Sequence, residues 1–224
     1  IVASVRRGRI IFDNITKFLR YLLSSNMGEI FTVFFGIVLA GVIGLRDPAN
    51  PGALILPLLA TQILWINLVT DSAPAIAMGL DPEIDDVMDR PPRDPRKRII
   101  DRAMWARIIS TGLVMGAVTL VTMDLLLPGG LFEGNGLFDA NESFVTARTA
   151  GFTTLVLAQL FNALSARSAF QSAFHRMFHN PWLWGALALT VVLQVAVVHV
   201  PLLQKAFGTV GLTEEKAARA LGEI

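Results

Sequence analysis

The sequence predicts an all-α fold: a polytopic transmembrane helical bundle of about five spans, with a cytoplasmic N-terminus and a helical stalk. Composition is the first indication, since hydrophobic residues make up 53% of the 224 positions and the mean hydropathy is +0.56, which is more apolar than an ordinary soluble domain. Length is the second, because five apolar segments reach the roughly 20 residues that a helix needs to cross a bilayer. Those segments are 22–44, 55–79, 103–127, 147–165 and 182–200.

Residues 1–20, which precede the first apolar segment, alternate basic with apolar side chains and contain no proline. We expect one helix to run from here directly into the first span and to project beyond the membrane as a stalk, at about 1.5 Å per residue. An amphipathic helix that lies in the membrane interface has a similar composition and is the alternative.

Basic residues gather in the loops on one side of the predicted spans, which sets the expected orientation. They precede the first span and fill the loop at 81–102: Arg6, Arg7, Arg9, Lys17 and Arg20, then Arg90, Arg93, Arg96, Lys97, Arg98 and Arg102. The opposite loop at 128–146 is acidic. We therefore expect the N-terminus and the 81–102 loop to be cytoplasmic.

Two of the spans contain polar side chains that are costly in lipid. Asn26 and Glu29 lie in the first span, and Asn67, Thr70 and Asp71 lie in the second. Spacings of three or four residues place the members of each set on one helix face. An intramembrane carboxylate faces a cavity, a partner or an ion. Carboxylate, amide and hydroxyl oxygens from two neighbouring helices are ligands for a hard cation, so the pattern predicts a metal site.

Two further residues favour this interpretation. Pro74 removes a helical hydrogen bond and should loosen the turn around Thr70, which would free carbonyl oxygens. Gly28 allows another helix to approach closely. The alternative is a pair of packed helices, one of them kinked, whose Asn and Asp side chains only hydrogen-bond to their neighbours.

The sequence shows no means of catalysis. We find no glycine-rich phosphate loop, no Ser/His/Asp set and no phosphorylatable Asp motif, so we expect no catalytic residue in this chain. The net charge of +1 and the apolar composition do not indicate a nucleic-acid partner. The chain lacks an initiator Met and ends in a polar stretch, 211–224, that cannot span a membrane. We expect it to be a fragment with a truncated tail.

Several runs resemble the P-type ATPases, in particular their calcium-pump branch. GRIIFDNITKFLRYLLSSNMGE (8–29), QILWINLVTDSAPAIAMGLDP (62–82) and MDRPPRDPR (88–96) are similar to the fifth and sixth transmembrane helices and the following loop of that family. FNALSARS (161–168) resembles the eighth helix, and PLLQKAFGTV (201–210) resembles the end of the ninth.

The resemblance implies the C-terminal membrane domain, helices five to nine, of an ATP-driven calcium pump. Residues 1–20 would end the phosphorylation domain and form the stalk, 21–210 would be the cation-transport domain, and 211–224 the tail. Ca²⁺ would be the transported ion, while Mg²⁺ and ATP would be used by cytoplasmic domains that this chain lacks. Those domains, helices one to four and the lipid bilayer, here a bacterial plasma membrane, would be its partners.

By the same resemblance, the cation ligands would be Asn26, Glu29, Asn67, Thr70 and Asp71. A gap-free match from Asn162 places Ala169 where two-site pumps carry a carboxylate on helix eight. We therefore expect one Ca²⁺ per cycle, with Glu29 as a candidate carrier of counter-transported protons. A pump for Mn²⁺, Na⁺ or H⁺ is an alternative, as is a non-enzymatic membrane module or passive cation channel derived from a pump.

Overall fold

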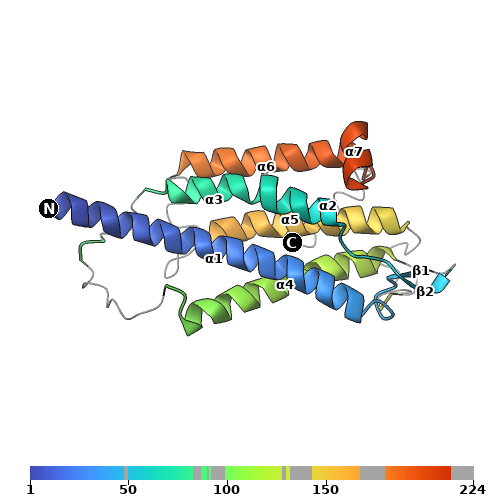
Figure 1. Ribbon diagram of the computed structural model, residues 1–224. Coiled ribbons are helices and arrows are strands. Elements are labelled where there is room, and N and C mark those ends of the chain that lie inside the picture. The colour runs from blue at the N-terminus through green and yellow to red at the C-terminus, as the bar shows by residue number, and fades with distance from the viewer. Residues whose placement is uncertain are drawn as a thin grey trace.

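The computed structural model describes residues 1–47, 50–82, 87–89, 91, 99–127, 130–131, 143–166 and 180–212, with the backbone alone at 46–47 and 50–54. In this part of the chain the helices form a bundle, and one short antiparallel hairpin lies at its end (Figure 1). The elements are α1 (Val2–Val38), β1 (Arg46–Asp47), β2 (Asn50–Leu54), α2 (Ala60–Trp65), η1 (Ile66–Thr70), α3 (Ser72–Gly79), α4 (Arg102–Leu126), α5 (Phe144–Ala166), α6 (Pro181–His199) and α7 (Pro201–Phe207).

The first helix joins the basic N-terminal segment to the first apolar one. α1 runs without a break from Val2 to Val38, as the sequence predicted, and its N-terminal end extends beyond the neighbouring helices (Figure 1). It ends earlier than the predicted boundary at 44, because turns occupy 39–44 and lead into the hairpin. The hairpin therefore lies at the end of the bundle opposite the N-terminus.

The second apolar segment is not one regular helix. Residues 60–65 are α-helical, 66–70 form a π-helix and 72–79 are α-helical again. In the π-helix the Asp71 N–H donates to the Ile66 carbonyl, five residues back, at 2.9 Å. Three residues later Pro74 has no N–H to offer the Thr70 carbonyl. The break confirms the predicted loosening of the chain around Thr70.

Four helices in the described residues are long and apolar enough to cross a bilayer: α1, α4, α5 and α6. The last three agree with the predicted spans to within a few residues. Side chains cap two of them, since Asp101 accepts from the Met104 N–H and Asn180 accepts from the Leu183 N–H. The polytopic helical bundle predicted from the sequence is thereby confirmed.

The run PLLQKAFGTV, which resembles the end of the family's ninth helix, does not continue α6, and its first seven residues form the separate short helix α7. α6 stops at His199, and α7 begins at Pro201. Val200 is extended, with φ −85° and ψ 120°, because a residue before proline is driven away from the helical conformation. α7 therefore turns away from the axis of α6 (Figure 1).

α1 is the central helix of the bundle, in contact with α3, α4 and α5, while α6 packs on α3 and α5. Its crossing with α4 is especially close. A Cβ added at Gly112 would lie 2.6 Å from the Met27 Cβ and 3.0 Å from the backbone nitrogen of Gly28. Small residues let two backbones approach in this way, and the close approach predicted at Gly28 is confirmed.

Candidate functional site

Glu29 of the first apolar segment meets Asn67 of the second where α1 passes η1. Asn67 donates from Nδ2 to Glu29 Oε2 at 2.7 Å and also to the Ile63 carbonyl at 3.0 Å. The Glu29 side chain is deep in the bundle, with the residue only 5% exposed. The structure therefore joins the two sets that the sequence singled out through a direct contact between Glu29 and Asn67.

Asp71 is the second buried carboxylate, and it lies just after the π-helix. It is 1% exposed, and its Oδ1 accepts a 2.7 Å hydrogen bond from the Tyr21 hydroxyl on α1. Its Oδ2 is buried and has no hydrogen-bond partner among the described residues. An unpartnered buried acceptor costs roughly 1–3 kcal/mol, and more when it is charged. A bound cation would remove that cost.

Thr70 and Asn26 take different positions. Thr70 is buried, and its hydroxyl donates to the Ile66 carbonyl at 2.9 Å. The Thr70 carbonyl, which Pro74 leaves without its helical donor, accepts from the Thr190 hydroxyl of α6 at 3.4 Å. Asn26 is half-buried, and its side chain makes no hydrogen bond within the described part of the chain. The structure thus brings Glu29 and Asn67 together and leaves Asn26 unengaged.

Sequence reasoning missed two residues of the cluster, Tyr21 and Gln159. Gln159, on α5, is 1% exposed and donates from Nε2 to Glu29 Oε1 at 3.1 Å. Its Oε1 is buried without a partner in the described structure. The spacing from Gln159 to Asn162 places both on one face of α5, and Asn162 hydrogen-bonds Ser24 on α1. That shared polar face was the available signal.

The position that carried the single-ion expectation, Ala169, lies outside the described residues. α5 nevertheless contributes a polar side chain to the cluster, the amide of Gln159. An amide oxygen is a neutral ligand, so α5 adds no charge to the pair of carboxylates.

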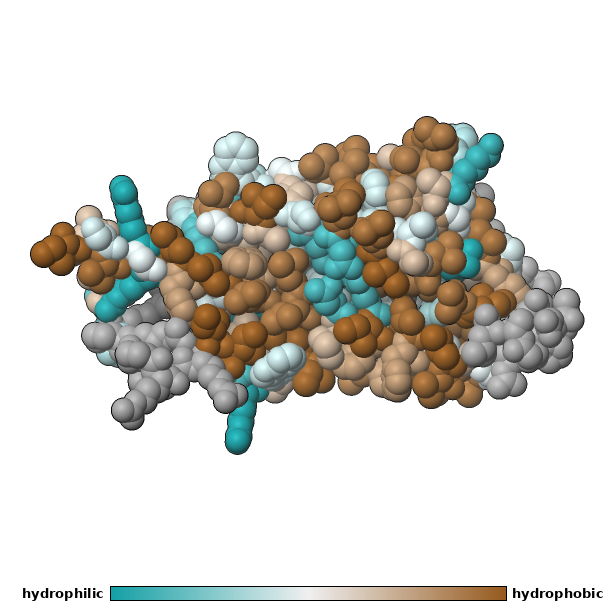
Figure 2. All heavy atoms as spheres, in the orientation of Figure 1, coloured by the Kyte–Doolittle hydropathy of each residue, from teal (hydrophilic) through white to brown (hydrophobic). Residues whose placement is uncertain are grey.

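The cluster reaches the surface on one side of the bundle. Asn67 is exposed although Glu29 and Asp71 behind it are buried. Figure 2 shows a hydrophilic patch about midway along an otherwise largely hydrophobic face, over the region where α1 passes η1. Of these three side chains, Asn67 reaches the surface on this face, and the two carboxylates lie behind it.

The donor set is made of oxygens. No group of three or more His, Cys, Asp or Glu side chains that could hold a metal occurs within the described ranges. The site offers instead two carboxylates with amide and hydroxyl oxygens around them. Such ligands suit hard cations such as Ca²⁺ and Mn²⁺ better than copper or zinc.

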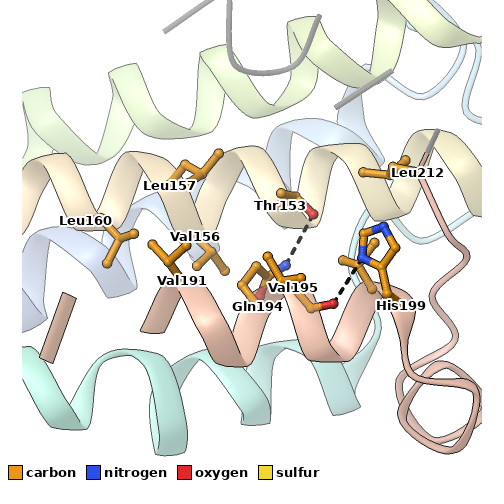
Figure 3. A pocket seen from close by; sticks show the side chains of 10 residues that line it. Thr153, Val156, Leu157, Leu160, Val191, Gln194, Val195, His199 and Leu212 are labelled. Carbon is orange, nitrogen blue, oxygen red and sulfur yellow. Dashed lines mark hydrogen bonds between the residues drawn. The ribbon is translucent and has the colours of Figure 1, made fainter. Parts of the chain in front are cut away.

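A hollow of a different character lies between α5 and α6 (Figure 3). Its volume is about 170 Å³, and its walls are mainly aliphatic, including Val156, Leu160 and Val191. The polar pair at its wall, Gln194 and Thr153, is joined by a 3.2 Å hydrogen bond from Nε2 to Oγ1. Since it offers no carboxylate, this hollow is not a candidate for the cation.

Together, the fold and the site define a class: a polytopic helical membrane protein with buried carboxylates and amides grouped at the depth of the bilayer. The family described as "Cation transporting ATPase, C-terminus" matches residues 55–222. The chain belongs to this family of cation-transporting ATPase C-terminal regions.

Two bacterial proteins illustrate the relationship. The chain is 37% identical over 213 residues to the "Calcium-transporting ATPase" of Bacillus subtilis (strain 168), a match that covers 95% of this chain and 21% of the relative. It is 33% identical over 221 residues to "Calcium-transporting ATPase 1" of Bacillus cereus (strain ATCC 10987 / NRS 248), covering 95% and 23%. The chain thus spans about a fifth of the length of these relatives. The matches confirm the resemblance to the calcium-pump branch.

Proposed function

We propose that this chain forms the cation-binding half of the membrane domain of an ATP-driven calcium pump. Glu29, Asn67, Thr70 and Asp71 supply oxygen ligands, and Asn26 joins them when the ion is bound. Ca²⁺ is the cargo. ATP and Mg²⁺ are used by cytoplasmic domains outside this chain, and further membrane helices of the same pump cover the open face.

The observation that carries the proposal is the buried pair of carboxylates, Glu29 and Asp71, on two helices in contact at bilayer depth. Amide N–H groups hold Glu29 on both oxygens, whereas Asp71 keeps one oxygen without a donor in the described structure. No Lys or Arg side chain is hydrogen-bonded to either carboxylate among the described contacts. A divalent cation is the natural neutralising partner for such a pair.

The proposal extends to the arrangement of the chain in the membrane. Residues 1–20 form the stalk and the end of the phosphorylation domain, 21–210 form the transport domain, and 211–224 are a tail. The N-terminus and the 81–102 loop face the cytoplasm of a bacterial cell. One Ca²⁺ moves in each cycle, and Glu29 carries a proton in the opposite direction when the ion has left.

The experiment is calcium-dependent ATP hydrolysis by the full-length protein in lipid vesicles, together with uptake of radioactive calcium. Asp71→Asn and Glu29→Gln each remove a charge without changing the shape, and each should raise the half-saturating Ca²⁺ concentration by about tenfold or more. The control is Asp89→Asn, because Asp89 is an exposed carboxylate away from the cluster. If Asp71→Asn leaves the Ca²⁺ dependence as in the unmodified protein, the site assignment is wrong.

The same preparation separates the alternatives. A pump for Mn²⁺, Na⁺ or H⁺ would couple ATP hydrolysis to that ion and not to Ca²⁺. A passive channel would show cation flux without ATP. A measured ratio of two Ca²⁺ per ATP would contradict the single-ion proposal and leave the site itself intact.

A further inference from the structure

A further buried carboxylate lies away from the cation cluster, at the end of α3 nearest the N-terminus of α1. Asp81 follows the last turn of α3 and is 2% exposed. Its Oδ2 forms a 2.7 Å ion pair with the Lys17 ammonium of α1. Its Oδ1 accepts a 2.9 Å hydrogen bond from Nδ2 of Asn180, the residue that caps the N-terminus of α6. One carboxylate therefore binds three helices together.

Two asparagines complete this junction of Asp81, Lys17, Asn180 and Asn14. Nδ2 of Asn180 also donates to the Ala77 carbonyl of α3 at 3.0 Å, and its Oδ1 caps α6 by accepting from the Leu183 N–H at 3.2 Å. Asn14 of α1 donates to the Asp81 carbonyl at 2.8 Å. A buried polar network in which the carboxylate and both amides are satisfied resists distortion, whereas removing one partner is costly.

The junction is connected to the cation cluster through α1 and α3. Tyr21 lies one turn beyond Lys17 on α1, and its hydroxyl holds Asp71 at the start of α3. Tyr21 also packs in an apolar cluster with Met78 of α3 and Leu183 of α6. α1 and α3 are thus joined at two levels by Lys17–Asp81 and Tyr21–Asp71, and Asn180 adds α6 to the same unit.

We propose that Asp81 and Asn180 are positioning residues that make α1, α3 and α6 move as one body, so that a displacement of the stalk end of α1 reaches Asp71. α6 supplies none of the proposed cation ligands, and its role here is to brace α3 from the side opposite α1. The inference rests on the proposed function, because transmitting a movement of α1 to Asp71 serves a purpose only in a pump whose cytoplasmic domains move the stalk.

The first test measures the geometry and needs no transport. This chain contains no cysteine, so single cysteines in place of Ile11 on α1 and Trp182 on α6, both exposed, can carry spin labels in the full-length protein once any cysteines outside this chain are replaced. The distance distribution between the labels should be narrow. Asn180→Ser keeps an oxygen to cap α6 but removes the link to Asp81, and it should broaden the distribution.

A second variant guards against simple misfolding. The double substitution Asp81→Asn with Lys17→Met removes both charges together and leaves no buried charge uncompensated. It should broaden the distribution as Asn180→Ser does, whereas Asp89→Asn, in an exposed position, should leave it narrow. Unchanged distributions in Asn180→Ser and in the double variant would overturn the proposal.

The second test separates positioning from ligand binding. In the calcium-dependent ATPase assay, Asn180→Ser should lower turnover by roughly fivefold or more, with the half-saturating Ca²⁺ concentration within about twofold of the unmodified value. Turnover equal to that of Asp89→Asn would overturn the coupling role. If the unmodified protein has no calcium-dependent activity, the proposed function fails, and the spin-label result still decides whether the junction holds the three helices together.

Discussion

At the scale of single residues, the most informative contact is that of Glu29 with two amides. Asn67 approaches one carboxylate oxygen from η1, and Gln159 approaches the other from α5. Both partners are neutral donors that also carry an oxygen, so they can hold the carboxylate without an ion and can turn an oxygen toward a cation when one is bound. Glu29 is thereby the point at which three segments of the chain meet.

This contact leads to a prediction for Gln159. Gln159→Leu keeps the volume and removes both the donor to Glu29 and an oxygen that has no partner among the described residues, so we expect the half-saturating Ca²⁺ concentration of the full-length protein to rise by about fivefold or more. Gln194→Leu is the matched control. Gln194 is also a buried glutamine whose oxygen has no partner in the described part of the chain, but it donates to Thr153, away from the carboxylates (Figure 3). Equal effects of the two substitutions would exclude a specific role for Gln159.

At the scale of elements, the sequence predicts lengths and boundaries better than internal breaks. α4, α5 and α6 follow from runs of apolar residues, and the interruption near Thr70 follows from Pro74. The π-helix itself does not follow from the sequence pattern. The residues around its bond from the Asp71 N–H to the Ile66 carbonyl are held by other helices, since Tyr21 donates to Asp71 and Thr190 donates to the Thr70 carbonyl. Gln159 was missed for a related reason, since its partner is 130 residues away.

The crossing of α1 and α4 supplies an element-scale prediction. Gly112→Ala would place a methyl group against Met27 and the backbone of Gly28, so the helices would have to separate, at a cost of roughly 1–3 kcal/mol. Gly185→Ala on α6 is the control, because a Cβ there meets nothing within 4 Å and alanine favours a helix. Thermal unfolding in detergent should show a lower midpoint for the first variant only. An unchanged midpoint would mean that the crossing adapts easily.

At the scale of the whole molecule, the ends of the bundle differ in charge. The N-terminus of α1, the start of α4 and the start of α6 lie at one end, and the hairpin and α7 lie at the other (Figure 1). Basic residues of the described elements are concentrated at the first end: Arg6, Arg7, Arg9, Lys17, Arg20, Arg102 and Arg107, against Arg46, Arg148 and Lys205 at the second. Cytoplasmic loops carry such an excess, which agrees with the proposed orientation.

The orientation can be measured with a membrane-impermeant thiol reagent, because this chain contains no cysteine of its own. Leu202, on α7, and Ile11, on α1, are exposed at opposite ends of the bundle. With cysteines outside this chain replaced, Leu202→Cys should be labelled in intact cells, and Ile11→Cys only after the cells are permeabilised. Equal labelling of both after permeabilisation is the control for reactivity. Labelling of Ile11→Cys in intact cells would contradict the proposed topology, because it would place the stalk outside the cell, away from the cytoplasmic ATP.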